Sequence, residues 1–399
     1  MIWLALWFAM IAVSSTVPVT PERLPAFMLG FWFGGSLLGQ LFALPFALIC
    51  TVLAITSAAV EVVLLFAISG GLFGFVHLRN RRAGRLLLDQ AGMKDTAIPL
   101  LAGLAPLLTG RGAVRRIAGL PYGDKGTRQK LDLIVPRAVS AAPMPILIHV
   151  PGGAWVTGKK NQQAKPLLNH LAARGWLCVD INYRLGPRHK VPDMIEDVLR
   201  AVAWVRAHAA EHGGDPARIA ITGGSAGGHL SSLAALAHDD PAFKPGFENA
   251  DCSVAAAVPL YGRFDFLDRS RRLGSNHKAV IENFMGKRLM PGMPTACPQV
   301  WHAVSPLDRV RADAPPMLVM HGTGDSLLPH GEGEEFAESL RAVSFASVVY
   351  HELPGIQHAW DVAASALTWA HVRVVEAFLN ESLKREPLPQ ARPGAKEAA

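Results

Sequence analysis

A serine enclosed by glycines is the feature of this sequence with the clearest chemical meaning. In "RIAITGGSAGGHLSSLAAL" (218–236), Ser225 follows a short apolar run and precedes a helix-like pattern. Gly223 and Gly227, two residues away on either side, suit a sharp strand-to-helix turn, where larger neighbours would collide. Such a turn strains the serine backbone and points its hydroxyl at a ligand. The next backbone N–H, that of Ala226, would lie at a helix N-terminus and face developing negative charge.

A serine hydroxyl is a poor nucleophile until a base takes its proton, and two downstream loops offer the missing groups. "MLVMHGTGDSLLP" places Asp325 just after a strand-like run at 316–321. "VVYHELPGIQHAWDV" places His358 just after a similar run at 347–353. The chain order serine, acid, histidine is one of the known orders of a Ser-His-Asp triad. We therefore predict Ser225 as nucleophile, His358 as base and Asp325 as the acid that orients it.

Other residues compete for the acid and base positions. Asp265 follows the run 254–261 and is an alternative acid, whereas Asp361 comes after the histidine, in the wrong order. The other histidines in this part of the chain lie within or at the ends of strands or further into a loop, where a histidine is more often structural (His321, His351 and His330).

An anionic intermediate needs two or more hydrogen-bond donors. "IHVPGGAWVTGKK" follows the run 145–150, and Gly152 and Gly153 have no side chains that would block their N–H groups. A simple turn would read the same way, but its location matches the second half of an oxyanion hole. We predict that Gly152, Gly153 and Ala226 form that hole.

Short β-branched runs alternate with helical patterns from about residue 116 onwards. "MIEDVLRAVAWVRAHAAEH" (194–212), for example, is apolar at helical spacing. This alternation predicts an α/β fold, with a mostly parallel sheet, helices on both faces and ligands beyond the carboxyl ends of the strands. The expected strands are 130–135, 145–150, 176–183, 218–222, 254–261, 316–321 and 347–353.

The domain plan follows from where this alternation starts and stops. We expect a membrane region at 1–80, a linker or N-terminal cap helices at 81–115, a catalytic domain at 116–384 and a disordered tail at 385–399. Residues 262–312 break the alternation and are expected to form a cap over the active edge, which the helical segment 81–115 could join. Six apolar side chains of this insertion either line an acyl pocket or only pack the insertion: Phe264, Phe266, Phe284, Met285, Met290 and Met293.

The first eighty residues carry most of the excess hydrophobicity of a chain that is 50% hydrophobic. Residues 26–78 have almost no charge and can hold two membrane spans, near 26–48 and 54–78. Residues 1–16 form a third span or lie at the interface; with no basic residue ahead of them, a cleaved signal peptide is not expected. Small residues one turn apart could let these helices approach closely, namely Gly30 and Gly34, Gly35 and Gly39, and Gly70 and Gly74.

The net charge of +7 is explained by a membrane rather than by a nucleic acid. Four arginines directly follow the apolar block, and no zinc spacing or helix-turn-helix signal accompanies them. By the positive-inside tendency this end faces the cytoplasm, so we expect an integral protein of the plasma (inner) membrane with a cytoplasmic catalytic part. The arginines are Arg79, Arg81, Arg82 and Arg85. The four cysteines form no disulfide framework, and the oligomeric state is not indicated.

Five segments in order resemble the bacterial hormone-sensitive-lipase-like carboxylesterases of the α/β-hydrolase superfamily, over roughly residues 115–382. The resemblance implies hydrolysis of short- to medium-chain acyl esters, a lid-like cap and no cofactor or metal. Pro151, Ala154 and Gly224 depart from the family pattern, and a membrane-spanning N-terminus is not typical of it. The segments are "HVPGGAW", "NYRLGPRHKVPDMIEDV", "GGSAGGHL", "HGTGDSLLP" and "ELPGIQHAWD".

The sequence therefore predicts a membrane-tethered carboxylesterase or lipase acting on a small-molecule ester or lipid. Two other interpretations stay open. One is an amidase or serine peptidase on the same fold, and the other is a membrane-anchored binding module without catalysis.

Overall fold

The computed structural model describes residues 1–17, 19, 26–107, 111–138 and 142–384. The expected disordered tail at 385–399 lies outside these residues. At the centre is one eight-stranded sheet with the order β1-β2-β4-β3-β5-β6-β7-β8, in which β2 runs antiparallel to both of its neighbours, β1 and β4, and the other pairs are parallel. The mostly parallel sheet is confirmed. Its strands are β1 (Val114–Pro121), β2 (Lys130–Pro136), β3 (Met144–Val150), β4 (Leu177–Ile181), β5 (Gly214–Gly224), β6 (Ala256–Leu260), β7 (Met317–Gly322) and β8 (Val348–Leu353).

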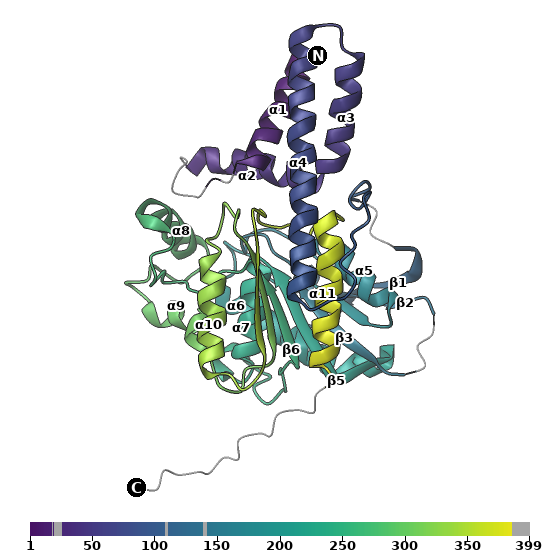
Figure 1. Cartoon of the computed structure of the whole chain (residues 1–399). Helices are drawn as coiled ribbons and strands as arrows, with labels where there is room; N and C mark the ends of the chain where they lie inside the picture. Colours follow the sequence, from purple (N-terminus) through teal and green to yellow (C-terminus); the bar gives the residue numbers. More distant parts are fainter. Residues whose placement is uncertain (18, 20–25, 108–110, 139–141, 385–399) are drawn as a thin grey trace.

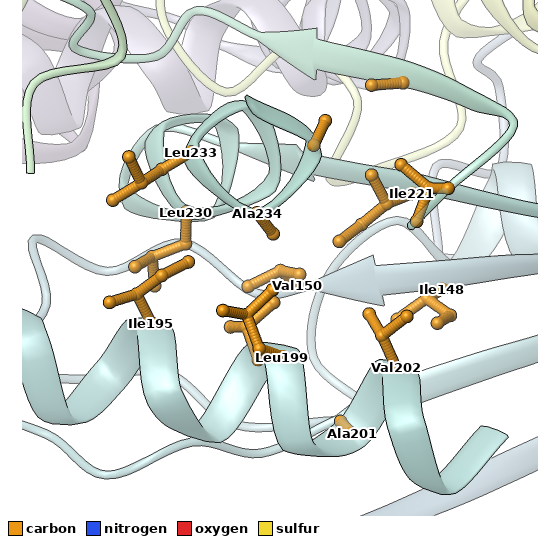
Figure 2. Close-up of a cluster of buried hydrophobic side chains, with 14 of the residues drawn as sticks. Ile148, Val150, Ile195, Leu199, Ala201, Val202, Ile221, Leu230, Leu233 and Ala234 are labelled. Atoms are coloured by element: carbon orange, nitrogen blue, oxygen red, sulfur yellow. The ribbon is translucent and has the colours of Figure 1, made fainter. Parts of the chain in front are cut away.

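Helices cover both faces of the sheet, as expected. One face is packed by α6 (Val191–His208), α7 (Ala226–Leu236) and α10 (Gly331–Val343). The other is packed by α5 (Lys165–Ala173), α11 (Ala366–Ser382) and the end of a long N-terminal helix. Figure 2 shows how the apolar stripe of α6 faces the strands and α7; the side chains include Ile195, Leu199 and Val202 on α6, Ile148 and Val150 on β3, and Leu230 and Leu233 on α7.

The strand β1 was not expected from the sequence. It lies at the sheet edge, carries two arginines and is only partly buried, so it lacks the apolar run that identifies a central strand. The register of its pairing with β2 shifts between Ile117 and Leu120. Edge strands with charged side chains are common, because only one neighbour has to be paired.

The insertion at 262–312 contains α8 (Gly274–Arg288) and α9 (Pro298–Ala303) and no strand, as expected. Four of its apolar side chains are buried in the main core and pack rather than line an open pocket: Phe264, Phe266, Met285 and Met290.

The segment 81–115 is a linker rather than a set of cap helices. Helix α4 (Val60–Gln90) ends within it, residues 91–107 are turns and loop, and a short 3-10 helix, η2 (Arg111–Ala113), precedes β1. These turns pack against α11, with the Ala364 N–H donating to Pro106 O, and not against the insertion. Figure 1 shows α8 and α9 at the left edge of the molecule, apart from α4 and α11 near its centre.

The N-terminal region is a bundle that projects from the sheet domain (Figure 1). Helices α1 (Ile2–Thr16) and α3 (Ala43–Thr56) pack along α4, around the rings of Phe8, Phe46 and Phe73. Helix α2 (Ala26–Leu41) lies across the base of the bundle, next to the sheet domain.

The span predicted near 26–48 is not one continuous helix. Residues 31–41 and 43–56 form two helices at 86° to each other. Pro45 explains the break, because proline has no N–H for the carbonyl of Leu41 and its ring clashes with that carbonyl. Among the helices that the structure describes, α4 alone is long and apolar enough to cross a membrane, and the bent pair counts as a second span only if its two arms are taken together.

Only some of the predicted small residues lie in close contact with a neighbouring helix. A Cβ on Gly35 or Gly39 would lie 2.5 Å from the hydroxyl of Ser14 or Ser15, so these glycines let α1 and α2 touch. A Cβ on Gly34 or Gly74 would meet no atom within 4 Å, and the side-chain surroundings of Gly30 are outside the described set.

Candidate active site

Ser225 occupies the turn between β5 and α7 with φ of +58° and ψ of −121°. This strained conformation is what a nucleophile at a strand-to-helix elbow adopts. A Cβ on Gly223 would lie 2.5 Å from the backbone of Gly227 and from the carbonyl oxygen of Val150. Both flanking glycines are thus required by close backbone packing, as the sequence pattern indicated.

Asp325 and His358 follow β7 and β8 and lie side by side. His358 Nδ1 donates to Asp325 Oδ2 over 2.6 Å, and both side chains are buried. Because an ionised carboxylate can only accept, the proton sits on Nδ1 and Nε2 carries the free lone pair. His358 therefore has the tautomer that a general base needs.

Asp325 accepts four hydrogen bonds. Its Oδ1 accepts from the backbone N–H groups of Leu327 and Leu328, at 2.8 and 2.9 Å. Its Oδ2 accepts from His358 and also from His321 Nε2, at 2.9 Å. Burial raises the pKa of Asp325, but the electrostatic interaction with His358 and the hydrogen bonds of both imidazoles outweigh it and hold the pKa well below its usual range.

The second imidazole was not foreseen. His321 is fully buried at the end of β7 and donates from Nε2, so its Nδ1 carries the lone pair and has no partner among the described atoms. Gly333 of α10 leaves room for this ring, since a Cβ there would lie 3.1 Å from Nδ1. The sequence could not indicate this contact, because a histidine inside a predicted strand is more often a structural residue of the core.

Tyr261 lies between the elbow and the histidine. Its ring is 4.6 Å from that of His358 at 60°, and its hydroxyl donates to Asp361. A Cβ on Gly224, the residue before Ser225, would collide with this phenol. The contact gives a reason for glycine at 224, where many members of the resembling family carry aspartate.

The structure brings Ser225 and His358 to the same strand-end edge without a hydrogen bond between them among the described contacts. His358 Nε2 is buried and has no partner among the described atoms. In unliganded sites the contact between nucleophile and base is often long and tightens with substrate. The lone pair of Nε2 is thus free to accept a proton.

The predicted oxyanion loop crosses directly over the serine. A Cβ on Gly152 would lie 3.3 Å from the Cβ of Ser225, and Gly153 has a φ of +131°, so neither position suits a larger residue. However, the Gly152 N–H already donates to Gln163 Oε1 over 2.8 Å. Gly153 and Ala226 remain as donors, because their N–H groups have no acceptor among the described residues. Gln163 is a neighbour that the sequence did not indicate.

The segment "NYRLGPRHKVPDMIEDV" holds this loop in place. Tyr183 donates its hydroxyl to Pro151 O over 2.8 Å, and the Gly186 N–H donates to Trp155 O over 2.9 Å. Arg184 in turn pairs with the buried carboxylate of Asp197, at 2.7 Å. The segment therefore acts on the site through the backbone of the glycine loop.

The alternative residues point elsewhere. Asp265 accepts from the backbone and guanidinium of Arg269, and Asp361 accepts from Tyr261. Among the described residues, the side chain of His358 is paired with Asp325 and with neither of these two carboxylates. Among the described residues, no group of three or more His, Cys, Asp or Glu side chains is placed to hold a metal ion.

A parallel sheet flanked by helices, with a strained serine at one strand end and an Asp-His pair at two others, defines an α/β-hydrolase. Residues 131–340 match the BD-FAE family, and the chain belongs to that family. This agrees with the resemblance drawn from the sequence motifs.

The relatives carry esterase names. The chain is 49% identical over 265 residues to the "Probable carboxylic ester hydrolase LipM" of Mycobacterium tuberculosis, covering 66% of this chain and 60% of that protein. It is 42% identical to "Esterase LipQ" of the same organism, covering 65% and 61%. The chain thus spans about three fifths of the length of these curated relatives.

A solved structure agrees in fold. The butyrate-bound esterase 2 of Thermogutta terrifontis is 26% identical with a TM-score of 0.56, covering 68% of this chain and 94% of that one.

Proposed function

We propose that this chain is a serine carboxylic-ester hydrolase, an esterase or lipase, acting on short- to medium-chain acyl esters. The observation that carries the proposal is the 2.6 Å hydrogen bond between Asp325 and His358, at the sheet edge that also presents Ser225 on a strained elbow. The esterase names of LipM and LipQ and the butyrate bound to the Thermogutta enzyme support the same chemistry.

In the proposed reaction, His358 Nε2 takes the proton of Ser225 as the hydroxyl oxygen attacks the ester carbonyl. Asp325 keeps the proton of the imidazole on Nδ1 and stabilises the imidazolium. The N–H groups of Gly153 and Ala226 bind the oxyanion, and Gly152 joins them when Gln163 releases its N–H. The imidazolium gives its proton to the leaving alcohol, and water releases the acid by the same route.

We place the enzyme at the inner membrane with the hydrolase in the cytoplasm. Large apolar side chains are exposed along the projecting bundle, for example Trp3 (81% exposed) and Ile55 (79%), where water would be a poor solvent. α1 and α3, with 15 and 14 residues, span only about 21–23 Å at 1.5 Å per residue, so α4 is the full-length span. Arg82 and Arg85 are exposed where α4 enters the hydrolase and suit the anionic leaflet surface.

The substrate is a lipophilic ester that reaches the site from the bilayer. The apolar turn residues Leu100, Leu101 and Leu107 are exposed beside the base of α4. Together with the exposed apolar side chains of the bundle, which projects from this end of the sheet domain (Figure 1), they give the hydrolase an apolar surface next to the N-terminal region. A hydrolase whose histidine loop contacts the apolar N-terminal region suits an ester held in lipid.

Labelling with a fluorophosphonate probe tests the catalytic proposal. Full-length protein in detergent should be labelled, and Ser225→Ala should lose both the label and about a millionfold in kcat on p-nitrophenyl butyrate. The Thermogutta esterase, of similar fold, has been solved phosphonylated by sarin. Wild-type protein that takes no label would count against any serine hydrolase, and equal rates on matched ester and anilide substrates would favour an amidase or peptidase.

Surface dilution tests the lipid proposal. The protein is reconstituted into vesicles that contain a fluorogenic medium-chain ester, and neutral lipid is added at constant bulk ester concentration. The rate should fall as the ester becomes dilute in the bilayer. A rate that follows only the bulk concentration would show that substrate arrives through water.

A further inference from the structure

Helix α2 belongs to the apolar N-terminal region, yet one of its faces touches the loop of His358. Phe33, Ser36 and Gln40 lie three and four residues apart and therefore share one face of the helix. The ring of Phe33 is 6.1 Å from that of His358 at 69°. Ser36 and Gln40 are buried, at 5% and 1% exposed, although most of the surrounding sequence is apolar.

Both polar side chains of α2 bind the same residue, Gln357. Gln40 Oε1 accepts from the Gln357 N–H over 2.7 Å. Ser36 Oγ accepts from Gln357 Nε2 over 3.1 Å. A buried N–H left without an acceptor costs about 1–3 kcal/mol, so these contacts fix Gln357 to α2.

Gln357 in turn holds the two loops that carry the acid and the histidine. Its Oε1 accepts from the backbone N–H groups of His358 and Ser326, both at 2.8 Å. Its Nε2 also donates to Ser326 Oγ over 3.0 Å. Ser326 directly follows Asp325, so one amide side chain spans both members of the Asp-His pair.

The C-terminal end of α2 is also fixed by α4, because Asn80 Nδ2 donates to Gln40 O over 2.9 Å. The neighbouring Arg79 donates to Ser15 O of α1 over 2.7 Å. The stem of Arg79 lies over Gly355 in the histidine loop, since a Cβ there would lie 3.0 Å from its Cδ. Movement of the bundle relative to the sheet domain would therefore act on the loop that presents His358.

We propose that Ser36 and Gln40 are positioning residues of the active site, which act through Gln357 to align His358 with Asp325 and Ser225. This rests on the proposed hydrolase function and makes the N-terminal region part of the catalytic unit rather than only an anchor. Activity on a water-soluble ester then depends on α2, although that substrate needs no membrane.

The test uses full-length protein in detergent and p-nitrophenyl butyrate, with active sites counted by fluorophosphonate labelling. Gln40→Met keeps the volume but removes the acceptor. It should lower kcat per labelled site by about tenfold to a hundredfold with little change in KM, because misalignment of the base acts on the chemical step. Ser36→Ala should have the same sign and a smaller size, because Gln357 Nε2 keeps its bond to Ser326.

Gln40→Glu and Leu38→Ala are the matched controls. Gln40 Nε2 has no partner among the described atoms, so an oxygen there removes no hydrogen bond and kcat should recover toward wild type. Leu38 lies on the same helix with 41% of its surface exposed, and its truncation should leave kcat unchanged.

A double-mutant cycle between Gln40→Met and Gln357→Leu completes the test. If α2 acts through Gln357, the double variant should be little slower than the worse single variant. Additive losses, or wild-type kcat per labelled site in both Ser36→Ala and Gln40→Met, would overturn the proposal. Its failure is distinct from failure of the hydrolase assignment, in which wild type itself takes no label.

Discussion

Two regions of the molecule meet at His358, and they bury polar groups for different reasons. In the strand-end loops, polar side chains are packed together, and Asp325 alone accepts four hydrogen bonds. In the N-terminal region the bundle core is built from phenylalanine rings, and large apolar side chains face outwards. Ser36 and Gln40 are the exception in the N-terminal region, because they are buried polar side chains with hydrogen-bond partners in a strand-end loop.

A hydropathy pattern does not distinguish apolar side chains that face outwards from polar side chains that are buried with partners. Exposed apolar side chains report on the surroundings of the bundle, whereas buried polar side chains with partners on a distant segment report on a built site. On α2 both occur on one helix, with Leu38 exposed and Gln40 buried. One face of an apolar helix can thus be exposed to its surroundings while another face contacts an active-site loop.

The strand-end loops can be tested by changing one carboxylate at a time. Asp325→Asn should reduce kcat on p-nitrophenyl butyrate by about ten-thousandfold, because the amide favours the wrong imidazole tautomer. Asp265→Asn is the matched control: its carboxylate is engaged by Arg269, so a loss of stability rather than of kcat is expected. Equal kcat losses in the two variants, measured per labelled site, would remove the distinction between them.

The junction between the regions can be tested at a glycine. A Cβ on Gly84 of α4 would lie 2.7 Å from Ile98 and 3.2 Å from Ala370 of α11. Gly84→Ala should therefore cost about 1–3 kcal/mol through overpacking, seen as a lower unfolding midpoint in detergent. Gly74→Ala on the same helix meets no atom within 4 Å and should be neutral or slightly stabilising. A stable Gly84→Ala would mean that α4 is not seated on the sheet domain as described.

The sequence predicted the parts of the site that depend on short-range patterns. Glycine spacing around Ser225 and the position of Asp325 just after an apolar run can be read locally, because strand ends and tight turns have local signals. The contact between Gln40 and Gln357 joins residues 317 apart, and no spacing rule reports it.

The misjudged elements also have physical reasons. β1 pairs on one side only and needs no apolar run. The bend before α3 had a signal in Pro45, but the uncharged stretch around it was long enough to suggest one continuous span. The Gly152 N–H looked free because the sequence gives no sign that Gln163 folds back onto it.

The second imidazole on Asp325 sharpens the comparison within the strand-end loops. His321→Leu removes one donor from Oδ2 and should lower kcat by about tenfold, since one hydrogen bond to a charged group is worth about 1.5–3 kcal/mol. The pKa of Asp325 should rise toward its usual range, so His321→Leu should lose less stability than the wild type as the pH falls below about 4, measured as the unfolding midpoint against pH. His321→Gln, whose amide nitrogen can replace Nε2, should restore both. If the dependence of stability on pH is the same in His321→Leu as in the wild type, the ring of His321 contributes only packing.

A buried histidine without partners should have the smallest effect, and one that depends on pH. Both ring nitrogens of His371 on α11 have no partner among the described atoms, and burial lowers its pKa to about 4. The unfolded chain binds a proton below about pH 6.5 but the native chain does not, so stability should fall by up to about 1.4 kcal/mol per pH unit from there down to about pH 4. His371→Leu should add about 1 kcal/mol at pH 7 and more at pH 5, measured by denaturant unfolding at both values. If the gain is the same at pH 5 as at pH 7, the ring titrates in the native protein as it does in water. His371 would then be accessible to solvent, unlike the buried side chains of the strand-end loops.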